Sequence, residues 1–276
     1  MTQKPWLATI LTNADQLPPM EAVQASLKKI PGYETLQFEP VSQEANHYVF
    51  RMHSALLAVT LTEVQADPEA ASVPVSELKK ACSRAWHWVD AAMEVPKANR
   101  QLLAAVLPDE DGLEPLDTAL LLTCLTVAIL KNTPAFAVYW NCSGMLHEPL
   151  SFMEHAVGIN RQTIPVELWV EFRLILNSDL TLSIGTWGMK AFALAELEVS
   201  HSRHDAQWLL RWLFNLAHLM LENGPLDTEM EHTFGQSDKE SFTLTYARSA
   251  PEIQRDGLED VLNVQFEISE KPRSDF

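Results

Sequence analysis

The chain has few cysteines for its length. Its 276 residues include only Cys82, Cys124 and Cys142, an odd number set in apolar surroundings. This spacing excludes a disulfide framework and is typical of buried thiols in a reducing compartment. The sequence therefore predicts a cytoplasmic protein.

Basic residues are also scarce, with 20 Lys and Arg against 37 Asp and Glu and a net charge of −17. Nucleic acid binding requires cations that neutralise phosphates, and anionic membrane surfaces require the same, so neither is expected as a partner. The charge favours solubility or the capture of a basic protein.

Long apolar runs are missing as well. The start, MTQKPWLATIL, has no long apolar stretch and no small-residue cleavage site, so no signal peptide is expected. The most apolar window, Ala119–Leu130, is too short to span a bilayer and contains two threonines. We therefore expect no membrane segment.

The periodic patterns indicate an N-terminal α+β half over residues 1–110. Residues alternate in strands and recur every three to four positions in helices. The expected elements are a strand at 6–12, a helix at 20–30, a hairpin at 47–61, a helix at 75–93 and a strand at 101–108. This β-α-β-β-α-β order is the ferredoxin-like arrangement.

A connecting segment, 111–134, contains a strongly apolar helix at 116–131, and a second half over 135–276 repeats the order. Its expected elements are a strand at 135–140, a short helix at 149–157, a hairpin at 169–186, a helix at 205–222 and strands at 241–247 and 261–268. The predicted fold is α+β, with two ferredoxin-like (βαββαβ) halves side by side and the apolar helix between them.

Four phrases carry a family resemblance: AVYWNCSGMLHEPLSFMEHA, PVELWVEFRLI, LSIGTWGMKAFALAELEV and LENGPLDTEMEHTFG. In order and spacing they resemble the bacterial family catalogued as domain of unknown function 4261, over a core of residues 100–236. Ala193 departs from the glycine usual in that family. The resemblance implies a fold unit without an assigned reaction, and a place among bacterial toxin–immunity systems.

The loop 141–148 follows a predicted strand end, which is a common place for function. Cys142 with His147 or His155 could form a nucleophile–base pair, because a reactive thiolate needs a nearby imidazole. No cysteine-hydrolase signature surrounds them. A buried thiol and a histidine bonded to the backbone is the commoner outcome of this pattern.

Metal and cofactor patterns are incomplete. His201, His204 and Asp205 offer two imidazoles and a carboxylate, but they precede a helix instead of sharing one helical face. Asp205 is better interpreted as the N-cap of that helix. The glycines of 185–188 lack phosphate-loop spacing. The sequence therefore predicts neither a metal nor a cofactor.

Two carboxylate pairs stand out. Glu167 and Glu171 alternate with Arg173 along a predicted strand, which favours an exposed, Arg-paired sheet face over acid–base chemistry. Glu196 and Glu198 flank one leucine in an extended segment, so both should point to the same side and form a polar rim.

The tryptophans divide between two predicted helices. Trp86 and Trp212 fit the core faces of these helices, whereas Trp88 and Trp208 lie nearer the polar sides. Half-exposed tryptophan beside acidic residues is typical of a protein interface. Large core side chains that fill the space between layers are the alternative.

These observations predict a non-catalytic protein-binding protein, with no catalytic residue assigned. Its preferred form is an immunity protein that neutralises a bacterial toxin, such as a secretion-system effector, by binding it through an acidic surface. Two alternatives stay open: a hydrolase or transferase using His147 and Glu148, and a self-associating module, such as a homodimer. The candidate partner surface comprises His147, Glu148, Trp88, Glu167, Glu171, Glu196, Glu198 and Trp208.

Overall fold

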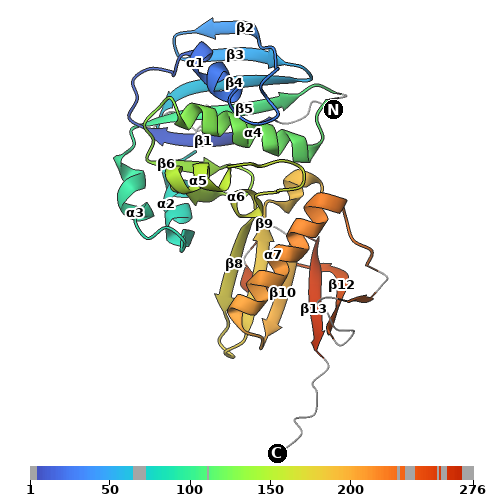
Figure 1. Ribbon diagram of the computed structural model, residues 1–276. Helices are drawn as coiled ribbons and strands as arrows, with labels where there is room; N and C mark the ends of the chain where they lie inside the picture. Colours follow the sequence, from blue (N-terminus) through green and yellow to red (C-terminus); the bar gives the residue numbers. More distant parts are fainter. Residues whose placement is uncertain are drawn as a thin grey trace, which may run out of the picture. The chain divides into compact units, whose positions relative to one another are not determined.

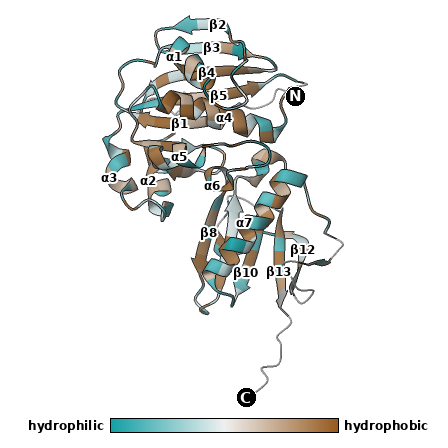
Figure 2. Cartoon of the chain, in the orientation of Figure 1, coloured by the Kyte–Doolittle hydropathy of each residue, from teal (hydrophilic) through white to brown (hydrophobic). Residues whose placement is uncertain are grey.

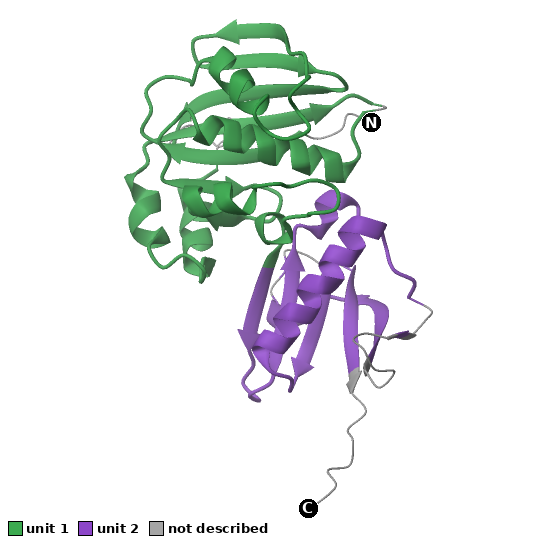
Figure 3. Ribbon diagram, in the orientation of Figure 1, with its two compact units in different colours: residues 1–171 green, residues 172–276 purple. Residues whose placement is uncertain are grey.

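The computed structural model describes residues 5–64, 73–110, 112–228, 231–233, 240–253, 255 and 260–268. Its fold is α+β, with helices packed against two β-sheets (Figure 1). The chain divides into two compact units, Met1–Glu171 and Phe172–Phe276 (Figure 3). The α+β class predicted from the sequence is confirmed.

The first unit contains one antiparallel sheet and its helices. Its strands are β1 (Trp6–Thr12), β2 (Glu39–Glu44), β3 (His47–Met52), β4 (Ala55–Glu63), β5 (Arg100–Pro108), β6 (Ala137–Trp140) and β7 (Met145–His147). Its helices are α1 (Met20–Leu27), α2 (Val75–Arg84), α3 (Ala91–Glu94), η1 (Val95–Lys97), α4 (Pro115–Leu130), α5 (Pro149–His155) and α6 (Val166–Trp169). The sheet order is β2-β3-β4-β5-β1-β6-β7.

This order differs from the ferredoxin-like half that the sequence predicts. In that arrangement β1 would lie between β5 and the hairpin, whereas here the hairpin strand β4 pairs with β5. β1 pairs antiparallel with β5 on one side and with β6 on the other. The strand expected to open the second half therefore completes the first sheet, and the units divide after Glu171 instead of around 111–134.

Helix α4 also lies elsewhere than expected. It contacts β1, β5, α1 and α5, so it packs within the first unit and not between two halves. Thirteen of its sixteen residues are buried, which explains why it has no polar stripe and is largely brown in Figure 2. Thr123 and Thr126 fit this setting because their hydroxyls donate to Ala119 and Leu122 carbonyls, each at 2.8 Å.

The opposite face of the sheet is covered by α2, α3 and η1. Leu78 and Trp88 from this layer pack with Leu11 of β1 and Tyr139 of β6 in one buried cluster. The side chain of Gln101 in β5 accepts from the Val73 amide at 2.9 Å and donates to its carbonyl at 2.8 Å. These bonds attach the residues just before α2 to strand β5.

Two stacked tryptophans join β6 to the α4 side. Trp140 and Trp169 are fully buried, and their ring centroids lie 6.5 Å apart with nearly parallel planes. The Trp169 indole donates to Thr123 Oγ1 of α4 at 2.9 Å. A buried indole N–H with a partner avoids the desolvation cost that an unpaired donor would carry.

The second unit carries β8 (Glu171–Leu176), β9 (Leu182–Trp187), β10 (Leu197–Ser202), β11 (Glu231–Thr233), β12 (Glu240–Arg248) and β13 (Asp260–Ile268). Its helices are η2 (Met189–Phe192), α7 (Ala206–Asn223) and η3 (Pro251–Ile253). The sheet order is β11-β12-β13-β10-β9-β8, in which β10 and β13 run parallel. This mixed order again differs from a ferredoxin-like half.

Helix α7 lies along one face of this sheet (Figure 1) and buries the predicted apolar stripe, including Leu209, Leu213 and Met220. Its start confirms the predicted cap, because the Asp205 carboxylate accepts from the amides of Gln207 and Trp208. Among the described helices, none is both long enough and apolar enough to cross a bilayer.

The stacked tryptophans provide a test of this core. Trp169→Ala should lower the free energy of unfolding by about 3–5 kcal/mol, since it removes a large buried ring and leaves a cavity. Urea unfolding followed by circular dichroism measures the change. Trp86→Ala is the control: it removes the same side chain where it is 74% exposed and should cost less than about 0.5 kcal/mol. Equal losses would contradict the assigned core.

Candidate functional site

The turn 141–144 and the strand β7 are bound to Arg84 at the end of α2 and to His87 beyond it, all in the first unit. Arg84 donates from Nη2 to the Gly144 carbonyl at 3.3 Å, and its Nε lies 3.0 Å from Glu171 Oε1. The His87 Nε2 donates to the Leu146 carbonyl at 2.9 Å. Gly144, with φ of +77°, sits in the left-handed region and leaves room for the Arg84 guanidinium.

His147, the strongest catalytic candidate of the sequence, is a buried structural residue. Its Nε2 donates to the Leu168 carbonyl at 3.2 Å, and only 5% of the residue is exposed. Burial, with smaller contributions from the neighbouring His87 and His155, lowers its pKa to about 3. A neutral imidazole committed to a backbone carbonyl does not support acid–base chemistry at neutral pH.

Cys142 is no better suited to the predicted nucleophile–base pair. Burial raises the pKa of its thiol to about 11, although a hydrogen bond with the backbone of Leu7 acts in the other direction. The reactive form of cysteine is the thiolate, which is disfavoured here at neutral pH. The arrangement therefore matches the structural alternative and gives no support to a hydrolase at this loop.

The segment 86–93, which follows α2 and includes most of α3, exposes large apolar side chains. Trp86 is 74% exposed, Val89 91% and Met93 63%, whereas Trp88 is 9% exposed and packs in the core. The sequence assigns these two tryptophans the other way round. The predicted helix over 75–93 ends at Arg84, because Ala85 has a non-helical ψ of 58°, and its face assignment fails beyond that point.

Glu196 of the second unit is buried, and three hydrogen-bond donors contact its carboxylate. Its carboxylate accepts from the Thr186 hydroxyl at 2.8 Å and from the amides of Gly188 and Lys190 at 2.9 and 3.2 Å. Burial raises its pKa, and these donors oppose the shift. The glycine-bearing turn 185–188 therefore binds a carboxylate of its own chain. Ala193, where the resembling family has glycine, is left-handed at φ +59°.

Glu198, two residues on, forms a buried ion pair. Its Oε1 lies 2.6 Å from Arg255 Nε, and both side chains are at most 2% exposed. Ser249 and the Ala250 amide also donate to this carboxylate. The Arg255 guanidinium lies 4.2 Å from the Trp187 ring centroid, and that of Arg173 lies 3.8 Å from it. These bonds hold Ser249, Ala250 and Arg255 against the sheet.

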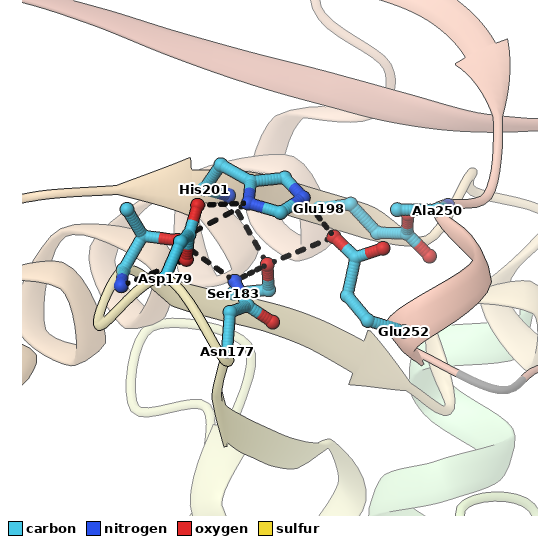
Figure 4. A network of polar contacts seen from close by, with 8 residues as sticks. Asn177, Asp179, Ser183, Glu198, His201, Ala250 and Glu252 are labelled. Atoms are coloured by element: carbon cyan, nitrogen blue, oxygen red, sulfur yellow. Dashed lines mark hydrogen bonds and ion pairs between the residues drawn. The ribbon is translucent and has the colours of Figure 1, made fainter.

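A polar network lies on the same unit beside this pair (Figure 4). The Ser183 hydroxyl donates to Glu252 Oε1 at 3.0 Å and accepts from the His201 amide and the Asn177 side chain. The His201 ring lies between carboxylates, with Nδ1 3.2 Å from Asp179 Oδ2 and Nε2 3.4 Å from Glu252 Oε1.

This network has residue types of a serine hydrolase but not its geometry. Ser183 is fully buried and donates to Glu252 instead of to an imidazole. His201 has φ of +49° at an irregularity in the β9–β10 pairing, which turns its ring toward Asp179. Donation by Thr181 lowers the pKa of Asp179 to about 2. The network therefore fixes the β8–β9 turn.

Most of the sequence-predicted surface is inside the molecule. Only Glu148 is exposed, while Glu167 and Trp208 are partly exposed. Five candidates are buried: His147, Trp88, Glu171, Glu196 and Glu198. Alternation fails for Glu167 and Glu171 because α6 occupies Val166–Trp169, so these two residues do not share a strand face. Glu196 and Glu198 are not a rim because internal donors hold both.

Within the described part of the chain, no group of three or more His, Cys, Asp or Glu residues could hold a metal ion. No family model matches the chain, and no significant match is found among curated proteins or solved structures. The resemblance to domain of unknown function 4261 therefore stays a prediction.

The buried histidine gives a pH test. In the unfolded chain His147 would titrate near 6.5, but its folded pKa is about 3, so the unfolded state binds more protons between these values. Its contribution to stability is complete above about pH 6.5 and falls with pH toward 3. His147→Gln is the control, because glutamine retains a side-chain donor but does not titrate. Between pH 7 and 5 the free energy of unfolding of the wild type should fall by about 1–2 kcal/mol more than that of the variant. Urea unfolding measures both proteins. An equal fall in the free energy of unfolding of the wild type and the variant would contradict a buried, neutral His147.

Proposed function

We propose that this protein is a non-catalytic protein-binding protein that recognises a basic partner through the segment 86–93. Its preferred biological form is an immunity protein that neutralises a toxin. The observation that carries the proposal is the exposure of Trp86, Val89 and Met93 on one short segment. Exposed clusters of large apolar residues commonly mark interaction sites, and tryptophan is enriched among interface hot spots.

The segment is held in a defined position, which favours binding. Trp88, in its middle, is anchored in the core, and His87 is bonded to the Leu146 carbonyl of the neighbouring loop. The Trp86 ring packs edge-on against the His87 ring at 5.8 Å. A preorganised apolar anchor loses less conformational entropy on association than a free one.

Charge supports a basic partner. The chain carries −17 overall, and Asp90 is an exposed acid within the segment. Glu148 is exposed at the end of the loop whose Leu146 carbonyl accepts from His87. Opposite charges accelerate association and orient the partners, while burial of the apolar anchor supplies most of the affinity. Of the candidate catalytic groups nearby, Cys142 has a pKa raised by burial, which disfavours its reactive thiolate, and His147 is buried and bonded to the Leu168 carbonyl.

Loss of the anchor provides the test. Trp86→Ala should weaken binding to the toxin that this protein neutralises, to be sought first among the products of neighbouring genes, by about 2 kcal/mol or more, roughly 30-fold, as expected for a hot spot. Isothermal titration calorimetry measures the affinity, and co-expression measures the rescue of growth. Tyr246→Ala is the matched control, since Tyr246 is a 63% exposed aromatic of the second unit.

The control should leave the affinity within about twofold of the wild type. If both variants bind equally well, the segment 86–93 is not the interface. If the wild type neither binds the toxin nor rescues growth, the immunity form of the proposal is wrong.

A further inference from the structure

The first unit contains a cavity of about 550 Å³ that lies apart from the segment 86–93. It opens between α2, the end of β4 and the segment 95–100 from η1 to β5. Its size is within the range of sites that hold small organic molecules. The cavity is independent of the proposed function, so it can be assessed separately.

The inner wall of the cavity is apolar. Leu78 of α2 and Val95 of η1 are buried, and Val64 and Cys82 are half-buried beside them. Val75 is 40% exposed at the same cavity, which is high for a valine that packs in a core. A ligand with a hydrocarbon body would cover this surface and remove it from water.

The remaining wall is cationic, against the charge of the whole chain. Lys79, Lys97 and Arg100 line the cavity with a single acid, Glu63, although acids outnumber bases 37 to 20 overall. Arg100 pairs with Glu63 at 2.8 Å, and Lys97 pairs with Glu94 at 2.6 Å. Lys79 has no ion pair with any residue that the structure describes, whereas the adjacent Lys80 pairs with Glu77.

We propose that this cavity binds an amphipathic monoanion, a carboxylic acid with an aliphatic or aromatic body. The body lies on Leu78 and Val95, and the carboxylate lies at the Lys79 ammonium. A charge pair at the surface of a protein is stronger than one in bulk water. The combination selects against neutral apolar molecules, which gain nothing from the ammonium, and against small inorganic anions, which gain nothing from the wall.

Titration with 8-anilinonaphthalene-1-sulfonate, an aromatic monoanion whose fluorescence rises in apolar surroundings, tests the proposal. One saturable site is expected, and decanoate should displace the probe from it. Decan-1-ol, which has the same chain without the charge, should compete about tenfold less well, because it forms no pair with Lys79. No saturable site, or equal competition by the alcohol, would overturn the proposal.

Two lysine variants locate the site. Lys79→Glu should weaken decanoate binding about tenfold or more, since the carboxylate would meet a like charge. Lys80→Glu makes the same change of charge on the neighbouring residue, which does not line the cavity, and should change binding less than about twofold. Equal weakening by both would show a general charge effect and overturn the site. Both lysines are exposed, and circular dichroism verifies the fold of each variant.

Cys82 supplies a second readout inside the cavity. Saturating decanoate should slow the alkylation of Cys82 by iodoacetamide several-fold, measured by peptide mass spectrometry. Cys142, which does not line this cavity, is the internal reference and should keep its rate. Unchanged alkylation of Cys82 in the presence of bound decanoate would place the ligand elsewhere and overturn the assignment.

Discussion

The first unit depends on the pairing of β1 along both of its edges. β5 follows β1 by nearly ninety residues and β6 by well over a hundred, yet each forms a full antiparallel register with it. Because β6 ends at Trp140, this pairing sets the position of the turn 141–144 and of β7, which pairs with β6. Arg84 at the end of α2 and His87 beyond it bond to the carbonyls of Gly144 and Leu146 there. The position of the exposed segment 86–93 follows from this contact.

A second constraint is the internal satisfaction of polar groups. His147 donates to a backbone carbonyl, Glu196 accepts from two amides and a hydroxyl, and Glu198 pairs with Arg255. Buried polar groups must find partners inside the protein, and these residues have found them locally. The residues that stand out in the sequence as candidates for function therefore have structural roles. The features left without a structural explanation are apolar side chains in water, and three of these, Trp86, Val89 and Met93, lie on one short segment.

Local structure could largely be predicted from the sequence, whereas strand order could not. β1 has the predicted bounds, and α4 and α7 lie within a residue of theirs. An unbroken apolar run that starts at a proline defines α4, whereas an apolar stripe and the Asp205 cap define α7. Sheet order depends on long-range pairing that a single sequence does not encode locally, so the sequence pattern places β6 in the second half, whereas it pairs with β1 in the first sheet. The tryptophan faces failed for another reason: one non-helical residue, Ala85, ended the period on which the prediction relied.

The central claim is that segment 86–93 is the partner-binding surface of a non-catalytic protein. Hydrogen–deuterium exchange of the full chain, with and without the proposed basic protein partner, tests it most directly. The account predicts slower exchange at residues 84–94, extending to loop 141–148, which shares hydrogen bonds with that segment. Protection confined to residues 172–276, with unchanged exchange at 84–94, would contradict it.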